Sequence, residues 1–234
     1  MTISASDIIN KLSEMASDDY AKEARRGVIG IETLTLLGIP HSELVALAEG
    51  FGNGAPMRDI ASELAAHDNY EARLLSYMLM DVSLFTEADA DETARGLDSF
   101  VVREYCCRNL LSKLPFAARK ALEWANSDDR VMTCSGFSLI SAIVRNMPED
   151  SPDETGLCDY SLFLLRKRAS EDSGDIMKAV ASCLVSIGRR SSAWLEAAIE
   201  TAEEISAQPS PNAKWVASQS IGILKSSRMK RGKE

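Results

Sequence analysis

Apolar side chains recur every three to four residues along almost the whole chain, which is the spacing of one face of an α-helix. Clear examples are Ile8, Ile9, Leu12 and Met15 near the start of the chain, and Ile176, Val180, Cys183, Leu184 and Ile187 further on. No segment alternates apolar and polar residues, as a half-buried β-strand would. The pattern therefore predicts an all-α protein.

Glycine, proline and capping residues divide this pattern into short helices. Helix ends are marked by Gly38 with Pro40, by Pro115 and by Pro209 with Pro211, and capping oxygens are available at Asn69, Asp129, Ser173 and Ser191. The predicted helices cover residues 6–16, 18–27, 41–50, 55–67, 69–82, 87–96, 99–113, 115–127, 129–146, 155–169, 174–189, 191–207 and 211–228.

These helices form roughly six pairs of about 35–40 residues each, which is the repeat length of HEAT and armadillo proteins. The pairing favours an all-α, right-handed α-solenoid or superhelix of about six HEAT-like helix pairs, in which each pair buries its apolar face against its neighbours. An irregular helical bundle is the alternative. We expect a single HEAT-like domain over residues 1–228 and a basic, disordered tail over residues 229–234.

The charge distribution limits where a nucleic acid can bind. The chain has 26 basic and 35 acidic residues and a net charge of −9, which excludes attraction of DNA by the whole surface. Residues 1–100 contain 7 basic and 18 acidic residues, whereas residues 101–234 contain 19 basic and 17 acidic residues. Any cationic face is therefore expected in the C-terminal half.

The sequence gives no support to metal, nucleotide or membrane chemistry. The five cysteines are odd in number and have no metal-ligand spacing, His41 and His67 stand alone, and there is no phosphate-binding or dinucleotide-binding glycine motif. There is also no secretory signal pattern and no run of about 20 apolar residues. We expect a cytoplasmic protein with no metal, no cofactor and no membrane partner.

Two kinds of helix face are candidates for ligand binding. On the helix over 99–113, Phe100 and Glu104 lie opposite the expected core side and are flanked by Arg103 and Arg108. The alternative is that Phe100 packs inside the protein and Glu104 pairs with Arg108.

Small and polar residues share a face in two later helices. In the first helix these are Cys134, Ser138, Ser141 and Arg145, and in the second they are Lys178, Ser182, Ser186 and Arg189. Such faces either line a groove that receives phosphates or simply face water. The tryptophans at 124, 194 and 215 are expected in the core.

Four stretches of the chain resemble a known family. They are RGVIGIETLTLLGIPHSELVALAE from residue 26, YEARLLSYMLMD from residue 70, the long stretch over 97–143 with its CCRNL, PFA and KALEWA motifs, and DIMKAVASCLVSIGRR from residue 175 with KWVAS from residue 214. With these motifs the chain resembles the DNA alkylation repair protein family, the HEAT-like-repeat DNA glycosylases that excise alkylated purines.

The resemblance implies a solenoid whose concave basic face holds duplex DNA by its backbone, without flipping the alkylated base, while a carboxylate near the sugar assists base loss. Phe100 and Glu104 stand where the family has a tryptophan and an aspartate. Cys134 stands at the position of a family arginine, and Ser182 at that of a second tryptophan. The longer side chain of Glu104 moves the carboxylate relative to an aspartate. Cys134 removes the phosphate contact of the arginine, and Ser182 removes the flat surface that the tryptophan presents to the DNA.

Two functions follow from this comparison of site residues. The first is an alkylpurine DNA glycosylase acting on double-stranded DNA with alkylated bases, in which Glu104 and Phe100 are the catalytic residues. Its phosphate contacts would be Arg103, Arg108, Lys178, Arg189 and Arg190. The alternative is a non-catalytic HEAT-like scaffold that binds a protein partner or an altered nucleic acid structure.

Overall fold

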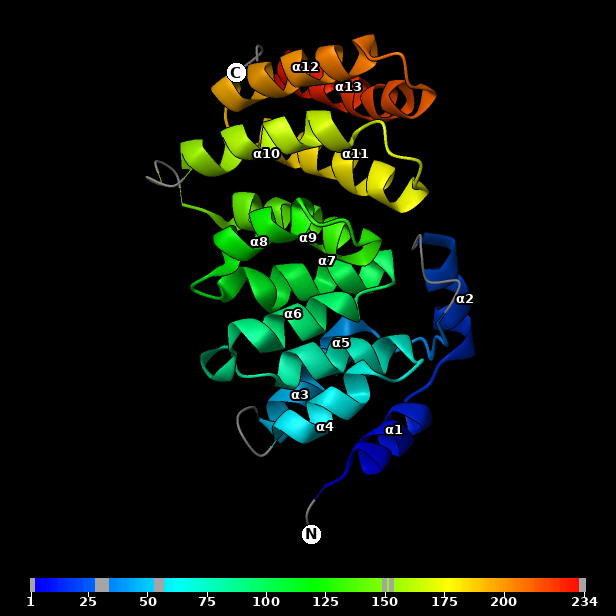
Figure 1. Cartoon of the computed structure of the whole chain (residues 1–234). Coiled ribbons are helices and arrows are strands. Elements are labelled where there is room, and N and C mark those ends of the chain that lie inside the picture. The colour runs from blue at the N-terminus through cyan, green and yellow to red at the C-terminus, as the bar shows by residue number, and fades with distance from the viewer. Residues whose placement is uncertain (1–2, 28–33, 53–56, 149–150, 152–153, 232–234) are drawn as a thin grey trace. The chain divides into compact units, whose positions relative to one another are not determined.

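The computed structural model describes residues 3–27, 34–52, 57–148, 151 and 154–231 (Figure 1). These residues form helices joined by short connections; the one β-type contact among them is an isolated bridge between Thr35 and Asn69. The chain separates into two compact units, residues 1–114 (unit 1) and 115–234 (unit 2). Each unit is described by itself, and the single domain over 1–228 stays a prediction.

Unit 1 is built around α5 (Tyr70–Leu79), which contacts α3 (His41–Phe51), α4 (Arg58–Ala65) and α7 (Phe100–Asn109). The other elements of unit 1 are α1 (Ala5–Glu14), α2 (Asp18–Gly27), α6 (Glu87–Arg95) and the 3-10 turns η2 (Val82–Leu84) and η3 (Leu111–Lys113). Four buried leucines, Leu44, Leu64, Leu75 and Leu79, lie in the cluster that joins α3, α4 and α5.

A buried carboxylate fixes the chain segment that leads into α3. The oxygens of Glu71 on α5 accept hydrogen bonds from the backbone N–H groups of Leu37, Gly38 and Ile39, at 3.1, 2.7 and 3.3 Å. Gly38 has a φ of +76°, and an added Cβ there would collide with the backbone of Ala21. The turn before α3 therefore requires glycine.

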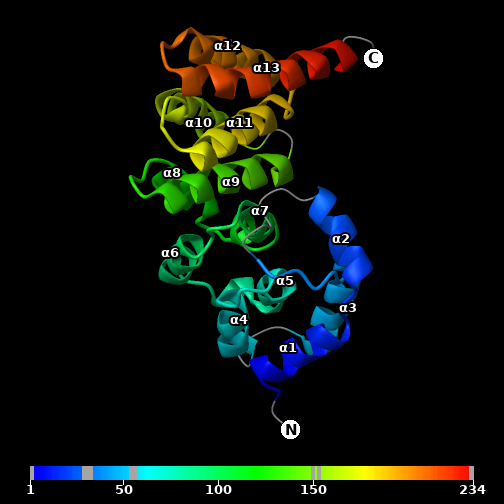
Figure 2. The same cartoon turned by 90° about the vertical axis from the view of Figure 1, so that its right-hand side faces the viewer.

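Unit 2 consists of three helix pairs in two layers. The pairs are α8 (Ala117–Ala125) with α9 (Arg130–Asn146), α10 (Glu154–Arg168) with α11 (Gly174–Gly188), and α12 (Ser192–Ala207) with α13 (Pro211–Arg231). α11 packs against both α9 and α13, while α10 contacts α8 and α12 (Figure 2). This repeated pairing is the arrangement of a HEAT-like solenoid.

The helices of the structure match those predicted from the sequence. All thirteen predicted helices are present, and their ends lie within three residues of the expected ones except in α7, which ends at Asn109 and is followed by the 3-10 turn η3 instead of continuing to residue 113. Asn69, Asp129, Ser173 and Ser191 are N-caps whose side chains accept backbone hydrogen bonds, as predicted. At the C-terminus α13 continues to Arg231, so residues 229–231 of the expected tail are helical; residues 232–234 lie outside the described part.

Candidate nucleic-acid interface

Three cationic residues line one hollow on unit 2. Arg145 lies near the end of α9, and Lys178 and Arg189 lie on α11. The hollow measures about 350 Å³. We call it the cationic hollow, and its lining consists of Arg145, Lys178, Ala181, Ser182, Val185, Ser186, Arg189, Trp215, Gln219 and Ile223.

The helical repeat explains why one face of α11 supplies most of this lining. Lys178, Ser182, Ser186 and Arg189 follow one another at intervals of three or four residues, so their side chains lie on one face. The other faces of α11 carry apolar side chains such as Val180 and Leu184, which are buried. The small residues between the two cations leave the space that the hollow occupies.

Hydrogen bonds fix Arg145 at the edge of the hollow. Its guanidinium Nη2 donates to the hydroxyl oxygen of Ser186 at 2.9 Å, and that hydroxyl donates to the carbonyl of Ser182 at 2.9 Å. The sequence placed Arg145 and Ser186 on two separate polar faces, and the structure brings these faces together because α9 packs against α11. Lys178 is exposed and forms no ion pair with another described residue.

Trp215 is a member of the hollow that the sequence analysis missed. We expected it in the core, but 37% of its surface is exposed and it lines the hollow from α13 together with Gln219 and Ile223. The expectation was correct for Trp124, which is 1% exposed. The spacing of Trp215, Gln219 and Ile223 at four-residue intervals is the signal for a shared face, but only the packing of α13 against α11 shows what this face meets.

Arg190 is not available to a phosphate in this structure. Its guanidinium donates to both carboxylate oxygens of Glu154 at 3.1 Å and to the carbonyl oxygens of Met147 and Pro148. These bonds tie the end of α9 and the start of α10 to the end of α11. The prediction that Arg190 contacts DNA is therefore replaced by a structural role within unit 2.

The two altered family positions lie in different surroundings. Cys134 on α9 is fully buried. Ser182 is half-buried and lines the cationic hollow. The hollow thus contains the small hydroxyl of Ser182 where the resemblance implies a tryptophan ring. A different aromatic ring, that of Trp215 on α13, lines the hollow instead.

The predicted residues on α7 belong to unit 1 and differ in exposure. Phe100 and Glu104, one helical turn apart, are half-buried, and Arg108 is exposed. Arg103 is only 1% exposed; its Nη1 donates to the carbonyl oxygen of Leu97 at 3.0 Å. The prediction of Arg103 as a phosphate contact thus fails on burial, since its charge is held inside the protein and lies 5.8 Å from the centre of the Phe100 ring.

The buried thiols and the remaining side chains offer little other chemistry. Burial raises the pKa of the Cys106 and Cys107 thiols well above the usual value, so both remain protonated small apolar residues. In the part of the chain that the structure describes, His, Cys, Asp and Glu side chains form no group of three that could hold a metal ion. None of the described helices is both long and apolar enough to cross a membrane.

Comparisons with known proteins place this arrangement in a family. Residues 8–213 match the sequence model of the DNA alkylation repair enzymes. A solved structure from a family described as related to the HEAT-like repeat DNA glycosylases, with affinity for branched DNA structures, is similar over 98% of this chain and 95% of that chain. The sequence identity is 18% and the TM-score is 0.75, which shows a shared fold.

More distant similarities add nothing to this assignment. An engineered protein is 13% identical, with a TM-score of 0.42, over 92% of this chain and 96% of its own. A designed armadillo repeat protein is 14% identical, with a TM-score of 0.38, over 78% of this chain and 90% of its own. No curated protein matches the sequence. Because the family model covers most of the chain, this protein belongs to the DNA alkylation repair enzyme family and has its HEAT-like repeat fold.

Proposed function

We propose that this protein binds DNA through the cationic hollow of unit 2 and recognises the shape of the DNA rather than its sequence. The observation that carries the proposal is the convergence of Arg145, Lys178 and Arg189 on one hollow from two neighbouring helices. Lysine and arginine side chains on a helical surface contact phosphate oxygens, which occur in every DNA sequence.

The charges of unit 2 support a local phosphate site rather than a general attraction. Residues 115–234 contain 16 basic and 16 acidic residues, so the unit has no net charge. Several of its cations are engaged in ion pairs, including Arg130 with Asp175 and Arg166 with Glu204. Lys178, by contrast, is an exposed member of the hollow with no ion pair to a described residue.

Branched DNA is the substrate that we propose as preferred. The similar solved structure belongs to a family with affinity for branched DNA structures. A hollow that contacts backbone phosphates and offers the exposed ring of Trp215 suits DNA in which strands diverge, since an aromatic face stacks on an unpaired base without sequence preference.

The test compares a four-way junction with a linear duplex of the same length and base composition, by fluorescence anisotropy at several salt concentrations. We expect tighter binding of the junction by the unmodified protein. Lys178→Gln should weaken binding by about tenfold. It should also reduce the slope of log affinity against log salt concentration by about 1, because one phosphate contact is lost.

Lys214→Gln is the matched control, because Lys214 is an exposed lysine of α13 outside the hollow. It should leave the affinity within about twofold. Absence of DNA binding at low salt, or equal losses in the two variants, contradicts the proposal.

A second candidate function is excision of alkylated purines, which rests on Glu104. This carboxylate is half-buried on α7, one turn from the aromatic ring of Phe100. A carboxylate stabilises the positive charge that develops on the sugar as the glycosidic bond breaks. Cys134 weighs against efficient excision, because a cysteine leaves no cation at the position where the resemblance implies an arginine.

Release of 7-methylguanine from duplex DNA under single-turnover conditions distinguishes this function from binding alone. Excision by the unmodified protein that falls by about a hundredfold or more in Glu104→Gln supports it. A release rate equal to that of free DNA eliminates excision and leaves the DNA-binding proposal unaffected.

A further inference from the structure

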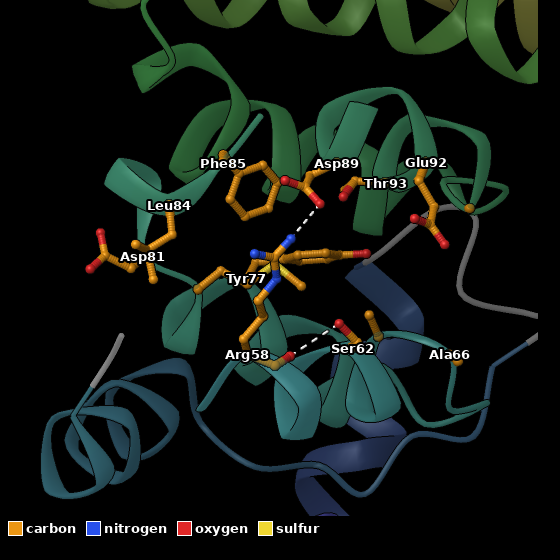
Figure 3. Close-up of a pocket in the computed structure, with 13 residues that line it drawn as sticks. Arg58, Ser62, Ala66, Tyr77, Asp81, Leu84, Phe85, Asp89, Glu92 and Thr93 are labelled. Atoms are coloured by element: carbon orange, nitrogen blue, oxygen red, sulfur yellow. Dashed lines mark hydrogen bonds and ion pairs between the residues drawn. The ribbon is translucent and has the colours of Figure 1, made fainter. Parts of the chain in front are cut away.

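A second cavity lies within unit 1. It measures about 250 Å³ and is bounded by α4, α5, η2 and α6 (Figure 3). Its apolar surface comes mainly from Tyr77, Met80, Leu84 and Phe85. This volume is slightly below the roughly 300 Å³ at which ligand pockets of proteins typically begin. The cavity therefore has room for a small molecule of about one ring.

The hydroxyl group of Tyr77 is an unusual feature of this cavity. Tyr77 is 5% exposed and lines the cavity, yet its hydroxyl forms no hydrogen bond with any described residue. Figure 3 shows the ring between Ser62 on one side and Asp89 and Thr93 on the other. Burial raises the pKa of Tyr77 well above its usual value, so the hydroxyl stays neutral. The hydroxyl oxygen keeps contact with the open space of the cavity, where a ligand group can donate a hydrogen bond to it or accept one from it.

The charges around the cavity favour a positively charged ligand. Arg58 extends from α4 to Asp89 on α6, where Nη2 lies 2.6 Å from the carboxylate, so these two charges offset each other (Figure 3). Two further carboxylates, Asp81 and Glu92, line the cavity, and neither forms an ion pair with another described residue. Hydrogen bonds from the Ser83 side chain and backbone lower the pKa of Asp81, which keeps it ionised.

Aromatic faces strengthen the preference for a cation. The rings of Tyr77 and Phe85 both line the cavity, and the face of an aromatic ring attracts an ammonium or guanidinium group within about 6 Å. An anionic ligand would instead meet the uncompensated carboxylates. The cavity therefore combines apolar surface, ring faces and a net negative charge.

We infer that this cavity is a binding site for a small organic cation, with an ammonium or guanidinium group on an apolar body of about one ring. The cation lies against Asp81 and Glu92, and the apolar body packs on Tyr77 and Phe85. This site lies in unit 1 and is independent of the proposed DNA contact in unit 2.

The test titrates the full-length protein with 2-phenylethylamine and follows the backbone amide signals by NMR. We expect a dissociation constant of about 1 mM, as for a fragment of this size, with shifts concentrated on α4, α5 and α6. The neutral match, 2-phenylethanol, and the anion 3-phenylpropionate should bind at least about fivefold more weakly.

Variants locate the charge contact. Glu92→Gln should weaken amine binding by about threefold to tenfold and leave binding of the alcohol unchanged, because it removes only the charge. Glu63→Gln is the matched control, since Glu63 is an exposed carboxylate of α4 that does not line the cavity. Equal affinity for amine and alcohol, shifts spread outside unit 1, or equal losses in Glu92→Gln and Glu63→Gln would overturn the inference.

Discussion

The two units use the same kind of helical packing to build hollows of opposite charge. Unit 1 has 10 basic and 19 acidic residues, and its cavity is apolar with carboxylates at its margin. Unit 2 has equal numbers of the two, and its hollow is lined by three cations. A HEAT-like scaffold fixes where a hollow forms, whereas the few side chains that face it decide what it binds.

The two units also differ in how their helices are held together. In unit 1 a single buried carboxylate, that of Glu71, accepts three backbone hydrogen bonds. In unit 2 helices α8 and α9 approach so closely at Gly136 that an added Cβ would lie 2.7 Å from the Cα of Ala125 and 2.8 Å from the carbonyl oxygen of Ala121. Substitutions at these two positions should therefore destabilise the units separately.

The largest expected effect is that of Glu71→Ala. It leaves three backbone N–H groups without an acceptor and should lower the stability of unit 1 by about 3–5 kcal/mol. Hydrogen exchange measured by mass spectrometry should rise in peptides from α3 and α5 and stay unchanged in those from α11. A uniform rise across both units would show that they unfold together.

Gly136→Ala should destabilise unit 2 by about 2–3 kcal/mol, because the helices must separate to admit the methyl group. All three tryptophans, Trp124, Trp194 and Trp215, lie in unit 2, so their fluorescence during denaturation in urea reports on this unit. Gly222→Ala on α13 is the control, since nothing lies within 4 Å of a Cβ there. A loss in Gly136→Ala that is no larger than in this control would contradict the close packing.

A weaker effect is expected from acid. The hydrogen bond from Arg190 holds the pKa of Glu154 below its usual value, so this pair stabilises folded unit 2 above about pH 4.5, and the stabilisation is lost as the pH falls through the folded-state pKa. The urea midpoint, followed by tryptophan fluorescence, should decrease less between pH 6 and pH 3.5 in Glu154→Gln than in the unmodified protein. Equal decreases would show that the pair contributes nothing to acid sensitivity.

The smallest effect is expected from Ser186→Ala, which removes the hydroxyl that holds Arg145 at the hollow. DNA affinity should fall by about twofold to threefold, because Arg145 must then be ordered on binding, while the stability stays nearly unchanged. Anisotropy titrations alongside urea denaturation check both quantities. A loss of affinity as large as that of Lys178→Gln would mean that Ser186 itself contacts DNA.

The helices and one face of the candidate site could be predicted from the sequence. Local signals determine both: capping residues begin the helices, and the spacing of Lys178, Ser182, Ser186 and Arg189 places them on one face. The environments of Arg103 and Trp215 could not be predicted, because they depend on which element packs beside them. Arg103 is buried next to the carbonyl of Leu97, and Trp215 faces a hollow rather than the core.

The cavity of unit 1 was beyond prediction for the same reason. Its residues come from four elements whose sequences show no common motif: Tyr77 lies on α5, Phe85 directly follows η2, and Glu92 lies on α6. Only the packing of α4, α5, η2 and α6 brings them together. Sequence patterns thus identify residues that share one helix face more readily than residues that share a cavity.

In the proposed function, the cationic hollow holds DNA by its phosphates. The most direct test measures the affinity for a four-way junction against salt concentration, for the unmodified protein and for the triple variant Arg145→Gln, Lys178→Gln, Arg189→Gln. We predict that the slope of log affinity against log salt falls by about 2 to 3 in the triple variant, since each phosphate contact contributes about 0.9. An unchanged slope and affinity would place the DNA contact elsewhere and contradict the account.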